Sequence, residues 1–400
     1  MTTPRRICVV RVDGQVVEDL YRDLMCVEVC DENDGASSFA IKLGIHLKDD
    51  GTWTRLDDGD GNFQVWQRIT IVAGFEGNED VLLDGYIAGV APRFEPQGSD
   101  SYLLIWGYDA SYSMAQEEKV VAWGDAKYSD VATTIFQDYG LGTDNVEDSQ
   151  VVHAEDDHLL IQRGSDWQFL KLLASRLGYE VFVRGGQGYF RPPQLSNTPQ
   201  PDLAAHFGPA ATNLVWFTPN VVGHMPTKVL KSRANVTENK VEDVEVAASP
   251  HRTLGDQDGE ALRSGRDAAG PAVRLARPDP AVSEQDMEFL VTSSRRQTDW
   301  TVEGEGEIDG RLYGFALKAN RLVLVKGVGR NFSGMYYVKK VIHHFTQKEY
   351  KQRFWGCRNG IGLMGDENFS GDEVAATEPV PQSSSDQPVE TRQSGRVVAP

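Results

Sequence analysis

"RITIVAG" at Arg68–Gly74 and "RLVLVKG" at Arg321–Gly327 share one strand pattern, in which an arginine leads alternating apolar residues and a glycine follows. The same landmarks come after each: a Gly-Tyr step, a phenylalanine, a tyrosine and a Trp-Gly pair. They are Gly85-Tyr86, Phe94, Tyr102 and Trp106-Gly107 in the first stretch, and Gly334-Met335-Tyr336, Phe345, Tyr350 and Trp355-Gly356 in the second. Such an ordered recurrence indicates an internal repeat. We therefore expect two similar β-barrel-like units in the chain.

Helical patterns lie between these β regions. One covers residues 128–140, with Ser129 as the expected N-cap. The next begins at Ser165, which forms a capping box with Gln168, and it ends at Gly178. A hairpin with a Gly-Gly turn follows. The fold class we expect is mainly β with an α+β insert: two similar tube-like β-barrel domains per chain plus a small α+β domain.

The domain boundaries follow from these changes of pattern. We expect a first β-barrel domain over residues 1–118, an α+β domain over 119–200 and a second β-barrel domain over 201–364. The last carries an exposed or poorly ordered loop at 249–280 and a helix at 283–300 that Ser283 caps. Residues 365–400 are rich in acids, Pro and Ser, which is typical of a disordered tail.

Composition excludes several classes of function. The 40 basic and 59 acidic residues give a formal net charge of −19, whereas nucleic-acid surfaces need clustered cations. No apolar run suits a signal peptide or reaches the roughly 20 residues that span a bilayer, so we expect no membrane anchor. The four cysteines have no zinc-site spacing, and we interpret them as free thiols that are at least half-buried. They are Cys8, Cys26, Cys30 and Cys357.

Two motifs carry possible metal ligands. His343 and His344 are adjacent in a predicted strand, so their side chains point to opposite faces and cannot easily share one ion. Asp57–Asn62 begins like a calcium loop, but Phe63 and Ile69 occupy the positions where an EF-hand needs Gly and Glu. We interpret the first as a barrel strand and the second as a solvated turn.

Other motifs are equally weak as reactive sites. "HAEDDH" at His153–His158 is interpreted as a polar loop, and the acids of "GEGE" at Gly304–Glu307 have no opposing carboxylate wall of the kind glycosidases use. Trp167 belongs to the apolar stripe of its helix. No Gly-x-Ser-x-Gly elbow occurs, and the Gly-rich segments open no helix. We predict no catalytic, cofactor-binding or metal-binding residue, no cofactor and no enzyme activity.

Three stretches carry a resemblance to a known family: Ser165–Pro192, Asn320–Phe354, and the predicted helix from Ser283 with the "WTVEGEGE" that follows it. Together they resemble the phage late control protein D family, the baseplate hub of contractile tails and related injection systems. The hub module of type VI secretion spike proteins is similar. With the N-terminal strands, the likeness covers most of residues 5–362.

The resemblance implies a structural role. It implies a homotrimer whose two tube-like barrels per chain form a pseudo-six-fold ring, joining the inner tube protein to a central spike within the baseplate. Only about 35 residues follow Gly365, so the spike is expected to be a separate protein. We expect assembly in the cytoplasm and incorporation into the particle.

Two alternatives from other classes remain at this point. One is a particle-associated hydrolase of cell-wall peptidoglycan, and the other is a carbohydrate-binding β protein. The hydrolase would release peptidoglycan fragments as a pure chain. The binding protein would bind sugar as a monomer, whereas a hub would form a trimer.

Overall fold

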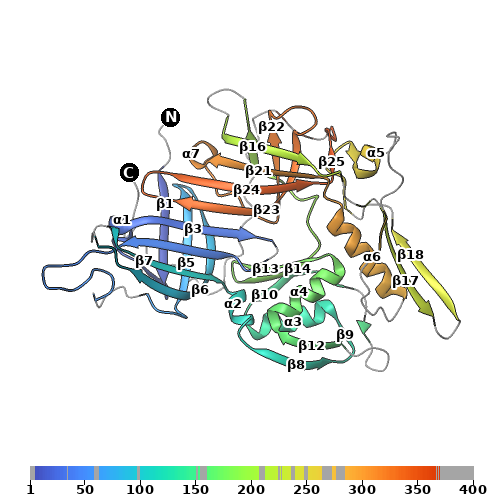
Figure 1. Cartoon of the computed structure of the whole chain (residues 1–400), viewed down its shortest axis with the longest axis horizontal. Coiled ribbons are helices and arrows are strands. Elements are labelled where there is room, and N and C mark those ends of the chain that lie inside the picture. Colours follow the sequence, from blue (N-terminus) through green and yellow to red (C-terminus); the bar gives the residue numbers. More distant parts are fainter. Residues whose placement is uncertain are drawn as a thin grey trace.

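The computed structural model describes most of the chain up to residue 365. The described residues are 5–33, 35–57, 63–96, 100–149, 152–153, 160–206, 212–223, 226, 228–235, 239–246, 251–263, 273–275, 284–365, 367 and 369. Within them, 13 strands form a single sheet that runs through both ends of the sequence. Figure 1 shows this sheet from β16 at the top, through β24 and β23, to β3 and β7.

The N-terminal half of the sheet is antiparallel, with the strand order β3-β4-β7-β6-β5-β1. Burial alternates along its strands as the sequence pattern predicts: in β4, Phe39, Ile41 and Leu43 are buried and their neighbours are not. The helical turn α1 (Leu20–Asp23) leads into β3. The strands are β1 (Arg6–Val12), β2 (Gln15–Val16), β3 (Leu24–Glu32), β4 (Ser38–Gly44), β5 (Arg68–Phe75), β6 (Asn78–Arg93) and β7 (Tyr102–Asp109).

The C-terminal half repeats this order as β16-β21-β24-β23-β22-β15. One pairing differs, because β15 is parallel to β22 whereas β1 is antiparallel to β5. A short helix, α7 (Gly310–Tyr313), follows β21. The strands are β15 (Gln200–Ala204), β16 (Leu214–Val221), β21 (Val302–Asp309), β22 (Arg321–Lys326), β23 (Gly334–Phe345) and β24 (Tyr350–Arg358).

Two β-bulges occur at the same places in both halves. The register of β3 against β4 shifts at Met25, and that of β16 against β21 shifts at Val215. Likewise, the shift between β6 and β7 falls at Ala88, and that between β23 and β24 falls at Lys339. A bulge is an extra residue that regular strand pairing does not need. Bulges at matching positions therefore indicate that the two halves are copies of one unit.

The strand registers show which sequence landmarks are equivalent. Trp106 and Trp355 both lie opposite the residue that follows a bulge, and Gly107 and Gly356 lie opposite the residue that precedes it. Phe345 ends β23, and its equivalent Phe94 is the first residue after β6. The other landmarks do not coincide: Tyr86 corresponds to Tyr337 instead of Tyr336, and the Arg, Gly and second Tyr pairs are displaced by one or two positions. The expected repeat is present, but those details of its alignment were wrong.

The mainly β class is confirmed, whereas two separate barrels are not seen. In the part of the chain that the structure describes, β1 has no pairing with β3 and β15 none with β16, so neither half closes. The halves are fused instead, because the end of β23 pairs with β3. Each half covers its own core: the first includes Ile41, Ile71 and Ile105, and the second Val323, Val341 and Phe354.

Between the halves the chain forms the expected α+β region, which lies below the sheet in Figure 1. Helix α4 (Asp166–Leu177) has the predicted capping box, in which Ser165 Oγ accepts from the Gln168 N–H (3.3 Å), and Gly178 ends it with φ 67°. Helix α3 (Tyr128–Asp138) begins earlier than predicted, with Lys127 as N-cap. Ser129 lies in its first turn and hydrogen-bonds Ser149, so the N-cap prediction was wrong.

The remaining elements of this region are α2 (Ser111–Met114), β8 (Glu118–Trp123), β9 (Ala126–Lys127), β10 (Gly142–Val146), β11 (Val152–His153), β12 (Leu160–Ser165), β13 (Glu180–Arg184) and β14 (Gln187–Arg191). The strands β13 and β14 form the predicted hairpin, and both glycines of its turn have positive φ. The domain boundaries drawn from the sequence stay a prediction.

The segment predicted as an exposed loop at 249–280 is ordered in the parts described. It forms β19 (Gln257–Asp258), α5 (Gly259–Arg263) and β20 (Val273–Leu275), and β19 pairs with β25 (Gly360–Ile361). Leu254 is buried, and the Asn359 side chain accepts from the Leu254 N–H (2.8 Å). Hydrogen bonds to the backbone therefore fix a segment that has few apolar side chains of its own.

The predicted helix after that segment is confirmed as α6 (Glu284–Thr298). It packs against α4 and against the hairpin of β17 (Lys228–Asn235) and β18 (Lys240–Val246). The expected cap at Ser283 and most of the expected tail at 365–400 lie outside the described residues. No helix in the described ranges is long and apolar enough to cross a membrane.

Candidate functional site

In the part of the chain that the structure describes, one side of the large sheet carries no helix or second sheet across both halves, and we call it the open face. Its side chains come from alternate positions of seven strands, so they form rows that run across the sheet in register. The open face comprises Glu28, Cys30, Glu32, Ser38, Ala40, Lys42, Ala91, Arg93, Tyr102, Leu104, Trp106, Tyr108, Glu303, Glu305, Glu307, Lys340, Ile342, His344, Lys351, Arg353 and Trp355.

Charges on the open face pair across neighbouring strands. Lys340 Nζ lies 2.9 Å from Glu32 Oε2, which links β23 to β3. Arg353 Nε donates to Glu305 Oε1 (2.6 Å), and Lys351 Nζ lies 3.6 Å from Glu307. Exposed pairs of this kind contribute at most about 1 kcal/mol each. Their consequence is a face that is nearly balanced in charge although the chain carries −19.

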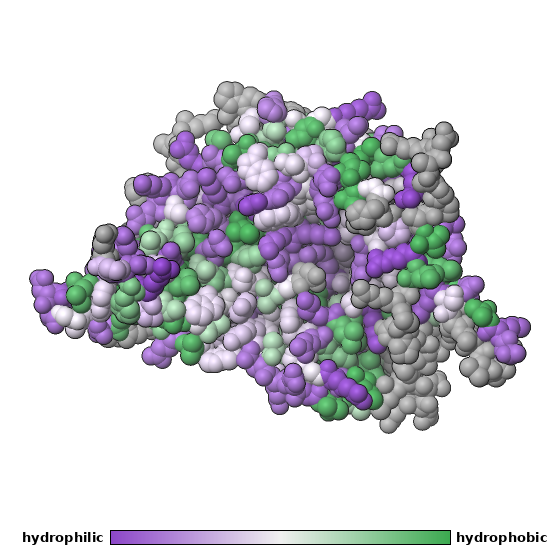
Figure 2. Space-filling model, in the orientation of Figure 1, coloured by the Kyte–Doolittle hydropathy of each residue, from purple (hydrophilic) through white to green (hydrophobic). Residues whose placement is uncertain are grey.

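Cations cover two of the aromatic rings on the open face. Lys42 Nζ sits 3.9 Å from the centre of the Tyr102 ring, and the Arg353 guanidinium lies 5.1 Å from that of Trp355. These contacts hold the long side chains flat along the sheet. Figure 2 shows hydrophilic residues spread over the middle of the side in view, with only small hydrophobic patches between them.

The two adjacent histidines lie on opposite sides of β23, as predicted. His344 is on the open face, 3.7 Å from Glu28, whereas His343 is buried on the core side. There His343 Nδ1 is 2.8 Å from the Tyr350 hydroxyl. Burial lowers the pKa of His343 to about 4, so this imidazole is neutral at neutral pH.

The buried imidazole gives a testable pH dependence. Its pKa of about 4 in the folded state lies below the ordinary 6.5, so the unfolded chain binds the proton first as pH falls. His343 should therefore lower the free energy of unfolding by about 2 kcal/mol between pH 7.5 and pH 5. Urea titrations of the wild type and of His343→Gln at both pH values measure this, and the variant should lose less. Equal losses would show that His343 does not carry the effect.

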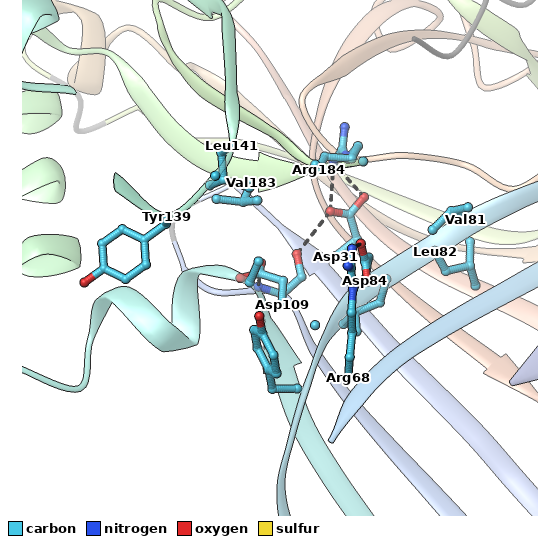
Figure 3. A pocket seen from close by; sticks show the side chains of 18 residues that line it. Asp31, Arg68, Val81, Leu82, Asp84, Asp109, Tyr139, Leu141, Val183 and Arg184 are labelled. Carbon is cyan, nitrogen blue, oxygen red and sulfur yellow. Dashed lines mark hydrogen bonds and ion pairs between the residues drawn. The ribbon is translucent and has the colours of Figure 1, made fainter. Parts of the chain in front are cut away.

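A polar cluster joins the sheet to the hairpin β13–β14 (Figure 3). From β3, Asp31 accepts two hydrogen bonds from Arg184 Nη2 (2.8 and 2.9 Å) and one from the Ala319 N–H (2.9 Å). Burial alone would raise the pKa of Asp31, but the Arg184 charge and these bonds outweigh it and hold that pKa below its usual value. The pair therefore fixes three distant segments at one point.

A second buried carboxyl of this cluster behaves in the opposite way. Asp109 accepts from the N–H groups of Ser37 (2.6 Å) and Ser111 (2.9 Å), but no cation pairs with it among the described contacts. Burial raises the pKa of Asp109 to about 6. The cavity between Asp109 and Arg184 has a volume of ≈ 150 Å³, enough for a few waters. We interpret it as a hydrated structural junction.

Glu180 makes the matching contact on the other side of the hairpin. It accepts from the Tyr337 hydroxyl (2.5 Å) and from Asn33 Nδ2 (3.2 Å), so it connects β13 with β23 and with the end of β3. A cavity of ≈ 450 Å³ lies beside it, lined by α4, α6 and residues such as His251 and Trp300. Burial lowers the pKa of His251 to about 4, and its ring packs on Trp300.

Sequence reasoning missed this junction. A weak signal was available, because Asp31 lies in a strand with apolar residues and Glu180 and Arg184 flank the apolar Val181–Val183. A charge at a buried strand position needs a partner, which the sequence alone does not identify.

The other weighed motifs do not converge on one site. Glu305 and Glu307 lie on the open face, each with a cation. Trp167 is buried in the core of the α+β region, as predicted. The four cysteines are free, as expected, with Cys8 and Cys357 buried. The acids at 58–62 and residues 154–158 lie outside the described residues. Among the described ones, no cluster of three metal-ligand side chains occurs.

Comparison with known proteins gives one family model and several similar structures. The model described as the Alg8 N-terminal domain matches residues 59–347. No curated protein matches the chain.

The similar structures include tail proteins and a chain of a PdpA–VgrG complex. The 43 kDa tail protein of prophage MuSo2 from Shewanella oneidensis is 10% identical with a TM-score of 0.65, over 88% of this chain and 98% of that one. The tail protein from Neisseria meningitidis MC58 is 11% identical with a TM-score of 0.59, over 90% and 98%. A chain of the Francisella PdpA–VgrG complex is 8% identical with a TM-score of 0.53, over 89% and 58%. At such identities, the likeness concerns the fold.

Proposed function

This chain belongs to the family described as the Alg8 N-terminal domain and has the fold of phage tail proteins of the baseplate-hub type, and from this we propose that it is a structural hub protein without enzymatic activity. Three copies would form a pseudo-six-fold ring. The ring would link the inner tube of a contractile tail, or of a tail-like injection system, to a central spike. The proposal draws on the fold and the repeat, since the family description itself specifies no reaction.

The observation that carries the proposal is the repeat inside one sheet. Both halves have the same strand order and share two bulges, and the halves join edge to edge where β23 pairs with β3. A chain that holds two equivalent units side by side can meet a six-fold partner with three copies. It can at the same time meet a three-fold partner, because three chains have true three-fold symmetry.

The open face supports a role as the wall of a channel. Its carboxylates and cations pair across neighbouring strands, and cations cover the rings of Tyr102 and Trp355. In a ring whose inner surface is this face, such a lining would offer passing cargo little charge and little apolar surface to bind. In that ring, each half would take the place of one tube-like barrel domain.

The partners follow from this arrangement. One side of the ring would contact the inner tube protein, the other a separate spike protein, and the outer elements other baseplate components. The Francisella relative is a chain of a PdpA–VgrG complex, which supports the expectation of a partner at such a hub. Assembly in the cytoplasm would precede incorporation into the particle.

The mass of the purified protein in solution tests the proposal. Light scattering coupled to size exclusion should give about 133 kDa, three times the chain mass of 44.3 kDa. The trimer should persist at micromolar concentration, because a specific ring interface buries well over 1,000 Å². A mass of a single chain at all concentrations would contradict the hub.

A further inference from the structure

The junction between the two halves shows how one unit joins the next. Strand β23 pairs with β22 through Gly334–Val338 and then, on the same edge, with β3 through Lys340–Phe345. The Asn33 N–H donates to the Lys339 carbonyl (3.0 Å), which makes Glu32–Lys340 a pair without mutual hydrogen bonds. The alternation then makes Cys30–Ile342 a pair of the same kind, on the open face.

Strand β6 is the counterpart of β23, but among the described strands it has no second partner. Its first half pairs with β5, and Ile87 exchanges hydrogen bonds with Trp66 and Gln67 (2.8 and 3.0 Å). Beyond Ile87, no described strand pairs with this edge of β6 over Gly89–Arg93. This is the segment that corresponds to Lys340–His344, whose edge carries β3.

Strand β16 is the counterpart of β3, and its outer edge also has no described partner. The Val222 N–H donates to the Thr301 carbonyl (2.8 Å), so the backbone groups of Val221 point away from β21, toward the outer edge. Apolar side chains are exposed at this strand: Val215 is 55% exposed, Trp216 37% and Val221 40%. At the end of β6, Phe94 is 54% exposed.

We propose that the β6 edge of one copy pairs with the β16 edge of a second copy, in the antiparallel register of the β3–β23 junction. The inference rests on the proposed trimer and names its interface. The repeat sets the register: Val90 would lie opposite Val221, and Ala91 opposite Asn220. Arg93 would lie opposite Thr218, and Phe94 opposite Phe217. Because each chain presents two different edges, the contact is head-to-tail and closes into a ring.

The side chains fit this pairing. On the core side, the register brings Val90 to Val221, Pro92 to Pro219 and Phe94 to Phe217, which are all apolar pairs. Phe217 is already anchored there, stacked on Phe354 with ring centres 5.8 Å apart. The exposed side chains of Val221 and Phe94 would thus each be covered by an apolar partner, as in cross-strand pairs within a sheet.

Two prolines shape the junction. Pro92 and Pro219 have no N–H, and the missing donor of each points to the free edge, where proline is tolerated in a sheet. Backbone hydrogen bonds between the two chains would therefore form on both sides of the Pro92–Pro219 pair, but the two prolines would exchange none. The missing donors make each edge a poor pairing partner for an arbitrary strand. The edge of the other copy still fits, because its own proline lies at the same place.

Disulfide trapping tests the register. Ala91→Cys and Asn220→Cys would place two thiols in a pair without mutual hydrogen bonds, where Cα atoms are about 4.5 Å apart and a disulfide is compatible. The native Cys26 and Cys30 are replaced by serine in this variant. Mild oxidation should give covalent dimers and trimers on a non-reducing gel. Mixing chains with only Ala91→Cys and chains with only Asn220→Cys should give covalent dimers alone.

Two controls use the same chain. Ala91→Cys with Thr218→Cys is displaced by two residues along β16, and it should cross-link roughly tenfold less because the Cα separation exceeds the disulfide range. Ile342→Cys with the native Cys30 reproduces the internal junction and should form a disulfide within one chain.

The outcomes separate this inference from the proposed function. Selective cross-linking of the 91–220 pair supports the interface. A trimeric mass without that cross-link, or with equal cross-linking of the displaced pair, would overturn the interface and leave the hub intact. A monomeric mass with no cross-link would overturn both.

Discussion

Replacing Arg184 by methionine is expected to lower the free energy of unfolding by about 3–5 kcal/mol, because it leaves the buried Asp31 carboxylate without its cation. Methionine keeps much of the apolar stem, so the loss is mainly that of the charge. Arg184 Nη2 bonds both carboxylate oxygens of Asp31, and Nη1 donates to the Ala319 carbonyl (3.2 Å). The substitution thus loosens the point where the hairpin β13–β14 meets both halves of the sheet.

Denaturant titration followed by tryptophan fluorescence measures this loss. Arg353→Met is the matched control, because Arg353 is 52% exposed and pairs with Glu305 on the open face. Its loss should be at most about 1 kcal/mol. Similar losses in the two variants would show that the Asp31–Arg184 pair is not a special anchor of the fold.

Gly107→Ala is expected to destabilise the chain by about 1–3 kcal/mol, because there is no room for a methyl group. A Cβ at this position would stand 2.0 Å from the Tyr86 carbonyl oxygen and 2.7 Å from the Phe39 ring. The carbonyl belongs to the backbone of β6, so relief requires moving a strand. The bulge of β6 beside it would have to shift as well.

The repeat supplies the control for this prediction. Gly356 holds the equivalent position in the second half, yet a Cβ there would meet its first neighbour, Tyr336 Cβ, at 3.3 Å. Gly356→Ala should therefore cost clearly less than Gly107→Ala in the same thermal melts. A larger loss at Gly356 would contradict the packing described for the two halves.

The repeat could be predicted from the sequence because short local sequence patterns identify it. Alternating strands, a Trp-Gly pair and a phenylalanine that ends a strand each depend on their own neighbourhood. Their register was less predictable. Matching Tyr86 with Tyr336 followed the Gly-Tyr letters, whereas the strand pairings make Tyr337 the equivalent residue.

The fusion of the halves into one sheet could not be predicted in this way. It depends on β23 pairing with β3, strands that lie at opposite ends of the chain. Nothing in either sequence specifies the other as its partner, apart from charges such as Glu32 and Lys340 that any exposed strand could carry.

In the candidate site, too, features set by local sequence could be predicted, whereas contacts between distant segments could not. The opposite orientation of His343 and His344 came from strand geometry, and the structure confirms it. The Asp31–Arg184 and Glu180–Tyr337 contacts were missed because they join elements far apart in the sequence. The order seen at Leu254 was missed because it comes from hydrogen bonds to the backbone, which leave no apolar pattern.

Electron microscopy of the purified protein tests the central claim most directly. Averages viewed down the particle axis should show a ring of six similar lobes around a channel, with three-fold symmetry when the α+β regions are included. Such a view would place the two halves of each chain as successive units of one ring. Isolated particles of single-chain size would contradict the account. Rings with a number of lobes other than six, which is two for each of three chains, would contradict it as well.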